Sequence, residues 1–109
     1  MTAAAILILT TLPDRARAEE IASALVRERL AACVAIGAAT RSIYHWQGKV
    51  ETSDEVTLTI KTRRERYADV EAALRAVHPY ELPEILAVPV IDGYAPYIGW
   101  IAAETEPRR

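Results

Sequence analysis

Two long strand patterns joined by a tight reversal constrain the fold of this chain most strongly. The segment Gln47-Gly48-Lys49 places a glycine where a two-residue turn requires positive φ. Before the turn, residues 33–36 and 42–46 predict one long strand, which we expect to kink at Gly37. After the turn, apolar residues alternate with polar ones, as in a strand with one buried face, at Val56, Leu58 and Ile60. The sequence therefore predicts a long β-hairpin.

A strand and an amphipathic helix are predicted before the hairpin. The apolar, β-branched run at 6–11 ends at Pro13 and is typical of a central strand covered on both faces. Asp14 follows as a candidate N-cap. The helix after it is expected to bury one apolar face, formed by Ala18, Ile21, Ala22, Leu25 and Val26.

A second helix and a last strand are predicted after the hairpin. Thr62 and Glu65 have the spacing of a capping box at the start of a helix. The apolar run at 85–91 predicts a strand, and Pro89 places it at a sheet edge or a bulge. A short terminal helix is expected to end in a frayed tail over 104–109. The apolar face of the second helix is expected at Tyr67, Val70, Leu74 and Val77.

The order of these elements is β-α-β-β-α-β with a C-terminal helix, which predicts a ferredoxin-like α+β fold in one domain over residues 1–109. The antiparallel sheet of such a fold has one open face and exposed edges, and here the hairpin carries Tyr44 and Trp46 near its tip. Long exposed edges with aromatic residues favour pairing with another chain. We therefore expect a symmetric homo-oligomer in which hairpins pair across subunits.

The charge and the single cysteine limit the partners and the location. A net charge of −2 and a pI of about 5.7 give no overall field that would attract nucleic acid or an anionic membrane. RRM domains share this topology, but they stack bases on sheet aromatics that residues 6–11 lack. Cys33 alone cannot form a disulfide within the chain, and neither a membrane-spanning run nor a signal peptide is recognised. We expect a cytoplasmic protein that binds neither nucleic acid nor membrane.

Candidate metal ligands and catalytic groups are scattered along the chain. We expect Cys33 to be a small buried side chain. Glu84 and His78 are the only tempting acid–base pair, without an obvious nucleophile or oxyanion hole. An acylphosphatase of this topology would need a phosphate-binding loop, and residues 10–13 supply no glycine for it. The sequence thus predicts a binding or signalling protein rather than an enzyme. The side chains with imidazole or sulfur donors show no pair at the spacing of a metal-binding motif. These residues are His45, His78, Cys33 and Met1.

Several ordered segments resemble one known family. The chain contains, in this order, LAACVAI, SIYHWQGKVE, TIKTRRERY and HPYELPEI. From Ile6 to Trp100 it is similar to the CutA (CutA1) family of divalent-cation tolerance proteins. This resemblance implies a ferredoxin-like subunit in a tight homotrimer that pairs through the long hairpin and is similar to the PII signalling proteins. It also implies a role in the response to metal ions, with copper binding in some members and no established enzymatic activity.

The resemblance carries a copper-binding pattern that this chain retains only in part. Family members proposed to bind copper have a cysteine at the end of the first strand and a His-His pair before Pro-Tyr. The matching positions here hold Thr10, Val77 and His78. We expect at most a weaker site for a divalent cation (Cu or Zn), formed by His78 with Glu81 or Glu84, or with a neighbouring subunit. The alternative is that His78 caps the preceding helix.

A ligand cleft is the second kind of site that the resemblance implies. It would bring the hairpin and the 78–84 connection together near a subunit boundary, with aromatic walls and a few polar groups. The alternative is that the aromatic residues only anchor the interface. The alternative to a metal-related role is a trimeric small-molecule-binding or signalling module, or a structural scaffold, with no physiological metal. The expected cleft residues are Tyr44, Trp46, Lys61, His78, Tyr80 and Glu84.

Overall fold

A computed structural model describes residues 4–107, which form an α+β fold with a four-stranded antiparallel sheet and three α-helices. In chain order the elements are β1 (Ala5–Leu12), α1 (Arg15–Arg27), β2 (Cys33–Trp46), β3 (Lys49–Arg63), the 3-10 turn η1 (Arg64–Arg66), α2 (Tyr67–Val77), β4 (Leu86–Pro89) and α3 (Ala95–Glu104). The strands lie in the order β2-β3-β1-β4. The predicted order of strands and helices is confirmed, and so is the position of the Pro89 strand at a sheet edge.

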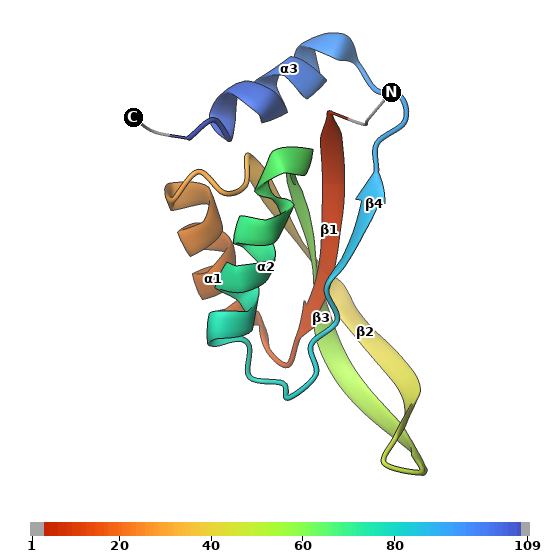
Figure 1. Cartoon of the computed structure of the whole chain (residues 1–109). Helices are drawn as coiled ribbons and strands as arrows, with labels where there is room; N and C mark the ends of the chain where they lie inside the picture. Colours follow the sequence, from red (N-terminus) through yellow and green to blue (C-terminus); the bar gives the residue numbers. More distant parts are fainter. Residues whose placement is uncertain (1–3, 108–109) are drawn as a thin grey trace.

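Helices α1 and α2 lie side by side on one face of the sheet and enclose the main core (Figure 1). Ile8 on β1 and Leu58 and Ile60 on β3 point into this core and are almost completely buried. The alternating pattern predicted this for Leu58 and Ile60. The prediction for Val26 is wrong: its side chain is 42% exposed, because α1 packs there over the outer strand β2. Val77, at the end of α2, is likewise exposed.

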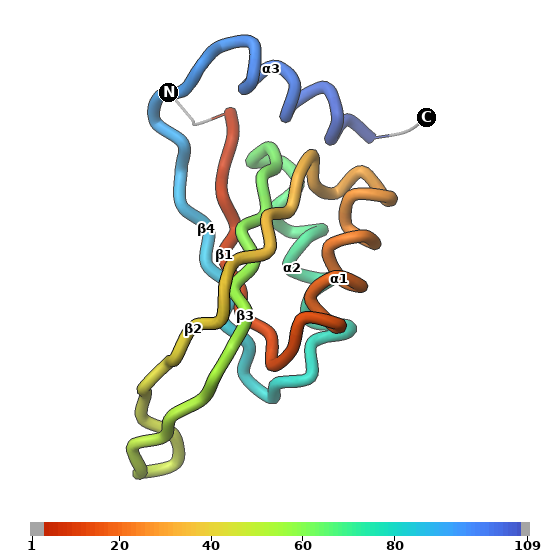
Figure 2. Tube along the Cα trace, turned by 180° about the vertical axis from the view of Figure 1, so that it is seen from behind, coloured from red at the N-terminus to blue at the C-terminus, as the bar shows by residue number. Residues whose placement is uncertain are grey.

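The hairpin of β2 and β3 projects beyond the helices at the end of the sheet opposite to α3 (Figures 1 and 2). Trp46 pairs with Lys49, and the two residues between them, Gln47 and Gly48, have φ of 50° and 80°. Positive φ at both central positions is the geometry of a type I′ turn, whose twist matches that of the strands. The predicted turn is therefore confirmed. The projecting hairpin helps to make the subunit 44 Å long.

The predicted kink in β2 is also present, as a register shift between Ile36 and Ala39. Gly37 lies in this shift, and a β-carbon at its position would collide with Oγ1 of Thr57 on β3. Glycine thus leaves room for the side chain of Thr57 where the strand bulges.

One helix cap was predicted correctly and the other was not. Oδ1 of Asp14 accepts a hydrogen bond from the backbone N–H of Arg17 at 2.8 Å, so Asp14 caps α1. The predicted capping box of the second helix is wrong, because Thr62 remains in β3 and pairs with Ile6 of β1. Its buried hydroxyl donates to the carbonyl oxygen of Leu30 at 2.7 Å. Pairing with Ile6 and this hydrogen bond keep Thr62 in the strand, although the sequence around it has the pattern of a helix start.

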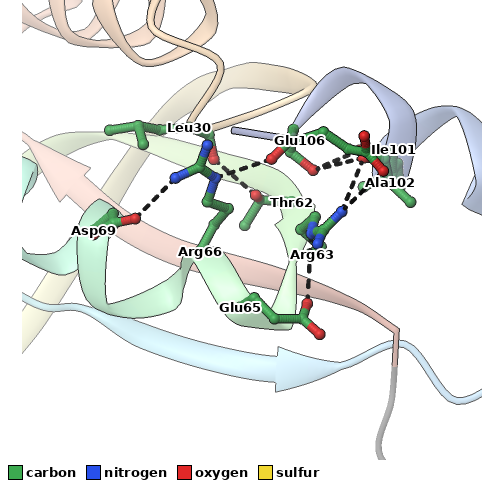
Figure 3. Close-up of polar contacts among 10 residues, drawn as sticks. Leu30, Thr62, Arg63, Glu65, Arg66, Asp69, Ile101, Ala102 and Glu106 are labelled. Carbon is green, nitrogen blue, oxygen red and sulfur yellow. Dashed lines mark hydrogen bonds and ion pairs between the residues drawn. The ribbon is translucent and has the colours of Figure 1, made fainter. Parts of the chain in front are cut away.

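The C-terminal end of α3 is held against the end of the sheet by arginine side chains (Figure 3). Arg66 donates to the carbonyl oxygen of Thr105 at 2.9 Å, and Arg63 donates to that of Ala102 at 3.4 Å. The last carbonyls of a helix lack intrahelical partners, and cations satisfy them favourably. Thr105 is fully buried, so the predicted fraying from residue 104 onward is wrong at this position, and residues 108–109 lie outside the described part. Within residues 4–107, no helix is long and apolar enough to cross a membrane.

Candidate functional site

A cavity of about 640 Å³ lies where the hairpin meets the connection between α2 and β4. Of the cleft residues predicted from the sequence, Tyr44, Trp46, Tyr80 and Glu84 line it. Tyr44 and Trp46 come from β2, whereas Tyr80 and Glu84 come from the connection. The two segments that were expected to form a cleft therefore do so within a single chain.

A buried carboxylate, that of Glu55 on β3, also lines this cavity. The residue is only 7% exposed, although it lies on the face of β3 opposite to the helices. The hydroxyl of Thr11 donates to its Oε2 at 3.1 Å. Among residues 4–107, no lysine, arginine or histidine forms an ion pair with Glu55, although the His78 imidazole lies near enough to feel its carboxylate.

Tyr80 covers Glu55 from the side of the connection. Burial raises the pKa of the Tyr80 phenol well above its ordinary value, and a hydrogen bond to Glu55 and the negative charge of that carboxylate raise it further. The phenol thus keeps its proton and acts as a donor. Glu55 and Tyr80 form a polar pair in the cavity that the aromatic side chains of the hairpin also line.

His78 lies behind Tyr80, with its ring centroid 4.9 Å from that of Tyr80. Its Nε2 is 2.8 Å from the carbonyl oxygen of Thr11, which can only accept, so Nε2 carries the hydrogen. Its Nδ1 accepts from the backbone N–H of Tyr80 at 3.2 Å. Burial lowers the pKa of the imidazole, so both ring nitrogens are engaged in the neutral form. The ring ties the connection to β1, and only the backbone N–H of His78 caps α2, at Leu74.

Comparison with known proteins identifies the family. The CutA1 divalent ion tolerance protein family matches residues 6–104, which is most of the chain. The chain belongs to the CutA1 family. It is 42% identical over 98 residues to the divalent-cation tolerance protein CutA of Thermus thermophilus, covering 90% of this chain and 95% of that one. It is also 44% identical over 96 residues to protein CutA of Mus musculus. This match covers 88% of this chain and 54% of the length of the mouse protein.

Solved structures of the CutA1 family have the same fold. The stable CutA1 from the psychrotrophic bacterium Shewanella sp. SIB1 superposes with a TM-score of 0.92 at 43% identity, covering 96% of this chain and 98% of that one. A CutA from Archaeoglobus fulgidus, described as periplasmic, superposes with a TM-score of 0.90 at 36% identity, covering 94% of this chain and 99% of that one. The α+β architecture described above is therefore that of the family.

The positions of the expected copper pattern are Thr10, Val77 and His78. Oγ1 of Thr10 lies 3.4 Å from Nε2 of His78, so the two positions adjoin, while Val77 is exposed. Glu81 and Glu84 line the cavity and are exposed to solvent. Nowhere in residues 4–107 do three or more histidine, cysteine, aspartate or glutamate side chains form a group that could hold a metal ion. The described residues of a single chain thus offer no such group by themselves, and Met1 lies outside them.

The remaining residues that the sequence suggested as ligands or cleft residues lie outside the cavity. Nζ of Lys61 donates to the hydroxyl of Tyr97 at 3.2 Å and lies 5.5 Å from the centroid of its ring, and it does not line the cavity. The hydrogen bond to Tyr97 raises the pKa of the Lys61 ammonium. Cys33 pairs with Lys61 across the sheet and is half-buried in the single chain, and His45 is exposed on the hairpin.

Sequence reasoning missed Thr11 and Glu55. The alternating pattern places Glu55 with Thr57 and Thr59 on the polar face of β3, which predicts a solvated glutamate. Its burial depends on the connection around Tyr80, which is remote from it in sequence and folds back over this face. No local pattern could have indicated this cover.

Proposed function

We propose that this chain is a divalent-cation tolerance protein that takes part in the response to metal ions. The observation that carries the proposal is the match of the CutA1 family over residues 6–104. The Thermus thermophilus relative, which this chain covers almost completely, is named a divalent-cation tolerance protein. We further propose that the chain is not an enzyme and that it acts in the cytoplasm, where its lone cysteine stays reduced.

The proposed working form is a homotrimer of ferredoxin-like subunits, similar in architecture to the PII signalling proteins. The strand order β2-β3-β1-β4, with adjacent strands antiparallel, supports the ferredoxin-like assignment. The assembly is supported by the two outer strands and by apolar side chains that a single subunit leaves in water. Ile43 on the hairpin is 69% exposed and Leu86 on β4 is 57% exposed. Exposed edges carrying such residues are surfaces that a symmetric partner can cover.

We propose that divalent cations such as Cu(II) or Zn(II) bind where subunits meet. The acidic cavity supports this location, because Glu81 and Glu84 are exposed at it and could add carboxylate oxygens to donors of a second copy. His78 could join such a site only if Tyr80 released its N–H from Nδ1. The alternative is a small-molecule-binding or signalling module without a physiological metal, and the aromatic lining of the cavity favours it.

Growth and calorimetry test the proposal together. A strain that lacks the gene should lose tolerance to raised copper, and the wild-type gene should restore it. Calorimetry of the purified apo protein with Cu(II), Zn(II) and Cu(I) should show binding that His78→Ala weakens. Equal binding by both proteins would show that His78 is no ligand. Unchanged growth of the deletion strain under every metal would contradict the proposed function.

A further inference from the structure

Arg29 has an unusual backbone conformation for its residue type. It follows α1, and its φ of 61° lies in the left-handed region, which glycine usually occupies just after a helix. Its guanidinium donates to the carbonyl oxygen of Ala103 at 3.0 Å and to that of Glu106 at 3.5 Å. It also lies 3.8 Å from the carboxylate of Glu104. Glycine would avoid the cost of this backbone conformation, so we attribute the arginine to its side-chain contacts with the end of α3.

Three arginines from three different elements hold this end of α3. Arg29 comes from the loop after α1, Arg63 from the end of β3 and Arg66 from η1, and together we call them the arginine clamp. Their guanidinium groups donate to the carbonyl oxygens of residues 102, 103, 105 and 106. The unpaired carbonyls at the end of a helix carry partial negative charge, so cationic donors suit them. The clamp therefore fastens α3 to the helix layer and to the sheet at once.

Apolar packing contributes little to the attachment of α3. Among its ten residues, all within the described part of the chain, only Ile101 is buried, and Ile98 is partly buried. Tyr97 and Trp100 are 40% and 42% exposed in the subunit. A segment with few buried apolar contacts opens locally at a lower free energy than the core does. The attachment of α3 thus depends mainly on the arginine clamp.

We propose that α3 is a strap that opens and closes as one unit over the end of the sheet, and that the arginine clamp keeps it closed. When closed, the strap packs Ile101 against Ala5 and Ala32 and places the hydroxyl of Tyr97 3.2 Å from Nζ of Lys61. Opening separates Tyr97 from Lys61 and frees the ammonium group. The strap then controls a group expected in the cleft between subunits, and this consequence alone rests on the proposed function.

The test is hydrogen exchange of the assembled protein, followed by mass spectrometry of peptides that cover 98–106. In wild type these amides should exchange at least about tenfold faster than those in the middle of β1, with little dependence on low urea concentrations. Arg29→Gly should raise exchange in α3 by about threefold or more, because it removes a charge-assisted donor. Exchange in α1 and β1 should not change, because glycine accepts the left-handed φ. Arg29→Lys, which keeps the charge without the planar fork, should lie between wild type and Arg29→Gly.

Arg27→Gln is the matched control. Arg27 is exposed in the last turn of α1, and within residues 4–107 neither its hydrogen bonds nor its ion pairs reach α3. Exchange in α3 as slow as in β1 would overturn the inference, because another contact, such as a second copy, would then hold the helix. An unchanged rate in Arg29→Gly, or an equal rise in Arg27→Gln, would overturn it as well. None of these results touches metal tolerance, which the growth experiment tests separately.

Discussion

Replacing Thr62 with valine tests whether a buried hydrogen bond holds the end of β3 in the sheet. Thr62 is fully buried, and its hydroxyl donates to the carbonyl oxygen of Leu30 at 2.7 Å. Valine has nearly the same shape, so Thr62→Val should leave no cavity and remove only the donor. The orphaned carbonyl in the loop after α1 should then lower the free energy of unfolding by about 1–3 kcal/mol.

The assay is urea denaturation followed by circular dichroism, at one fixed protomer concentration because assembly would couple to stability. Thr59→Val is the matched control, since Thr59 lies on the opposite face of β3, is half-buried, and makes no side-chain hydrogen bond within residues 4–107. The control should change the free energy of unfolding by less than about 0.5 kcal/mol. An equally small effect of Thr62→Val would refute the assignment of the hydrogen bond as the reason why the strand continues through residue 62.

Three further changes follow from the described contacts. Gly37→Ala should lower the free energy of unfolding by about 1–3 kcal/mol through its collision with Thr57, and Thr57→Ala should restore part of the loss, as measured in a double-mutant cycle. Arg66→Met should cost about 1–2 kcal/mol and raise amide hydrogen exchange in α3, because Arg66 holds the carbonyl of Thr105. Burial lowers the pKa of His78, so the unfolded chain binds the proton first as the pH falls. Stability measured by urea titration should thus be highest above pH of about 6.5 and decline as the pH falls below it, and His78→Gln should flatten this decline.

Specific results would contradict these predictions. Additive effects of Gly37→Ala and Thr57→Ala would show that the two positions do not collide. Arg64→Met is the control for Arg66→Met, since Arg64 is exposed, and an equal loss in both would remove the special role of Arg66. A pH profile of stability that is identical in wild type and in His78→Gln would show that His78 does not remain neutral in the folded protein.

The sequence predicted the elements whose signals are local. Alternation at Val56, Leu58 and Ile60, the glycine turn after Trp46 and the cap at Asp14 each depend on neighbours within a few residues, and the structure has all of them. The capping box at Thr62 failed because the strand partner Ile6, far away in sequence, competes for the same backbone. Local propensity cannot weigh that partner.

The candidate site could be predicted only in part, for the same reason. Tyr44, Trp46, Tyr80 and Glu84 were placed together by family resemblance, and they line one cavity. Glu55 was missed because its burial arises where the connection crosses the sheet. Lys61 and His78 do not line this cavity of the single chain, and their place in a cleft between subunits stays a prediction.

Light scattering of the purified protein during size exclusion, at micromolar concentration, tests most directly whether the exposed edges and hairpin are covered by other copies. The account predicts a particle of three times the chain mass of 12.0 kDa. A particle with the mass of a single chain, stable and monodisperse under those conditions, would contradict it.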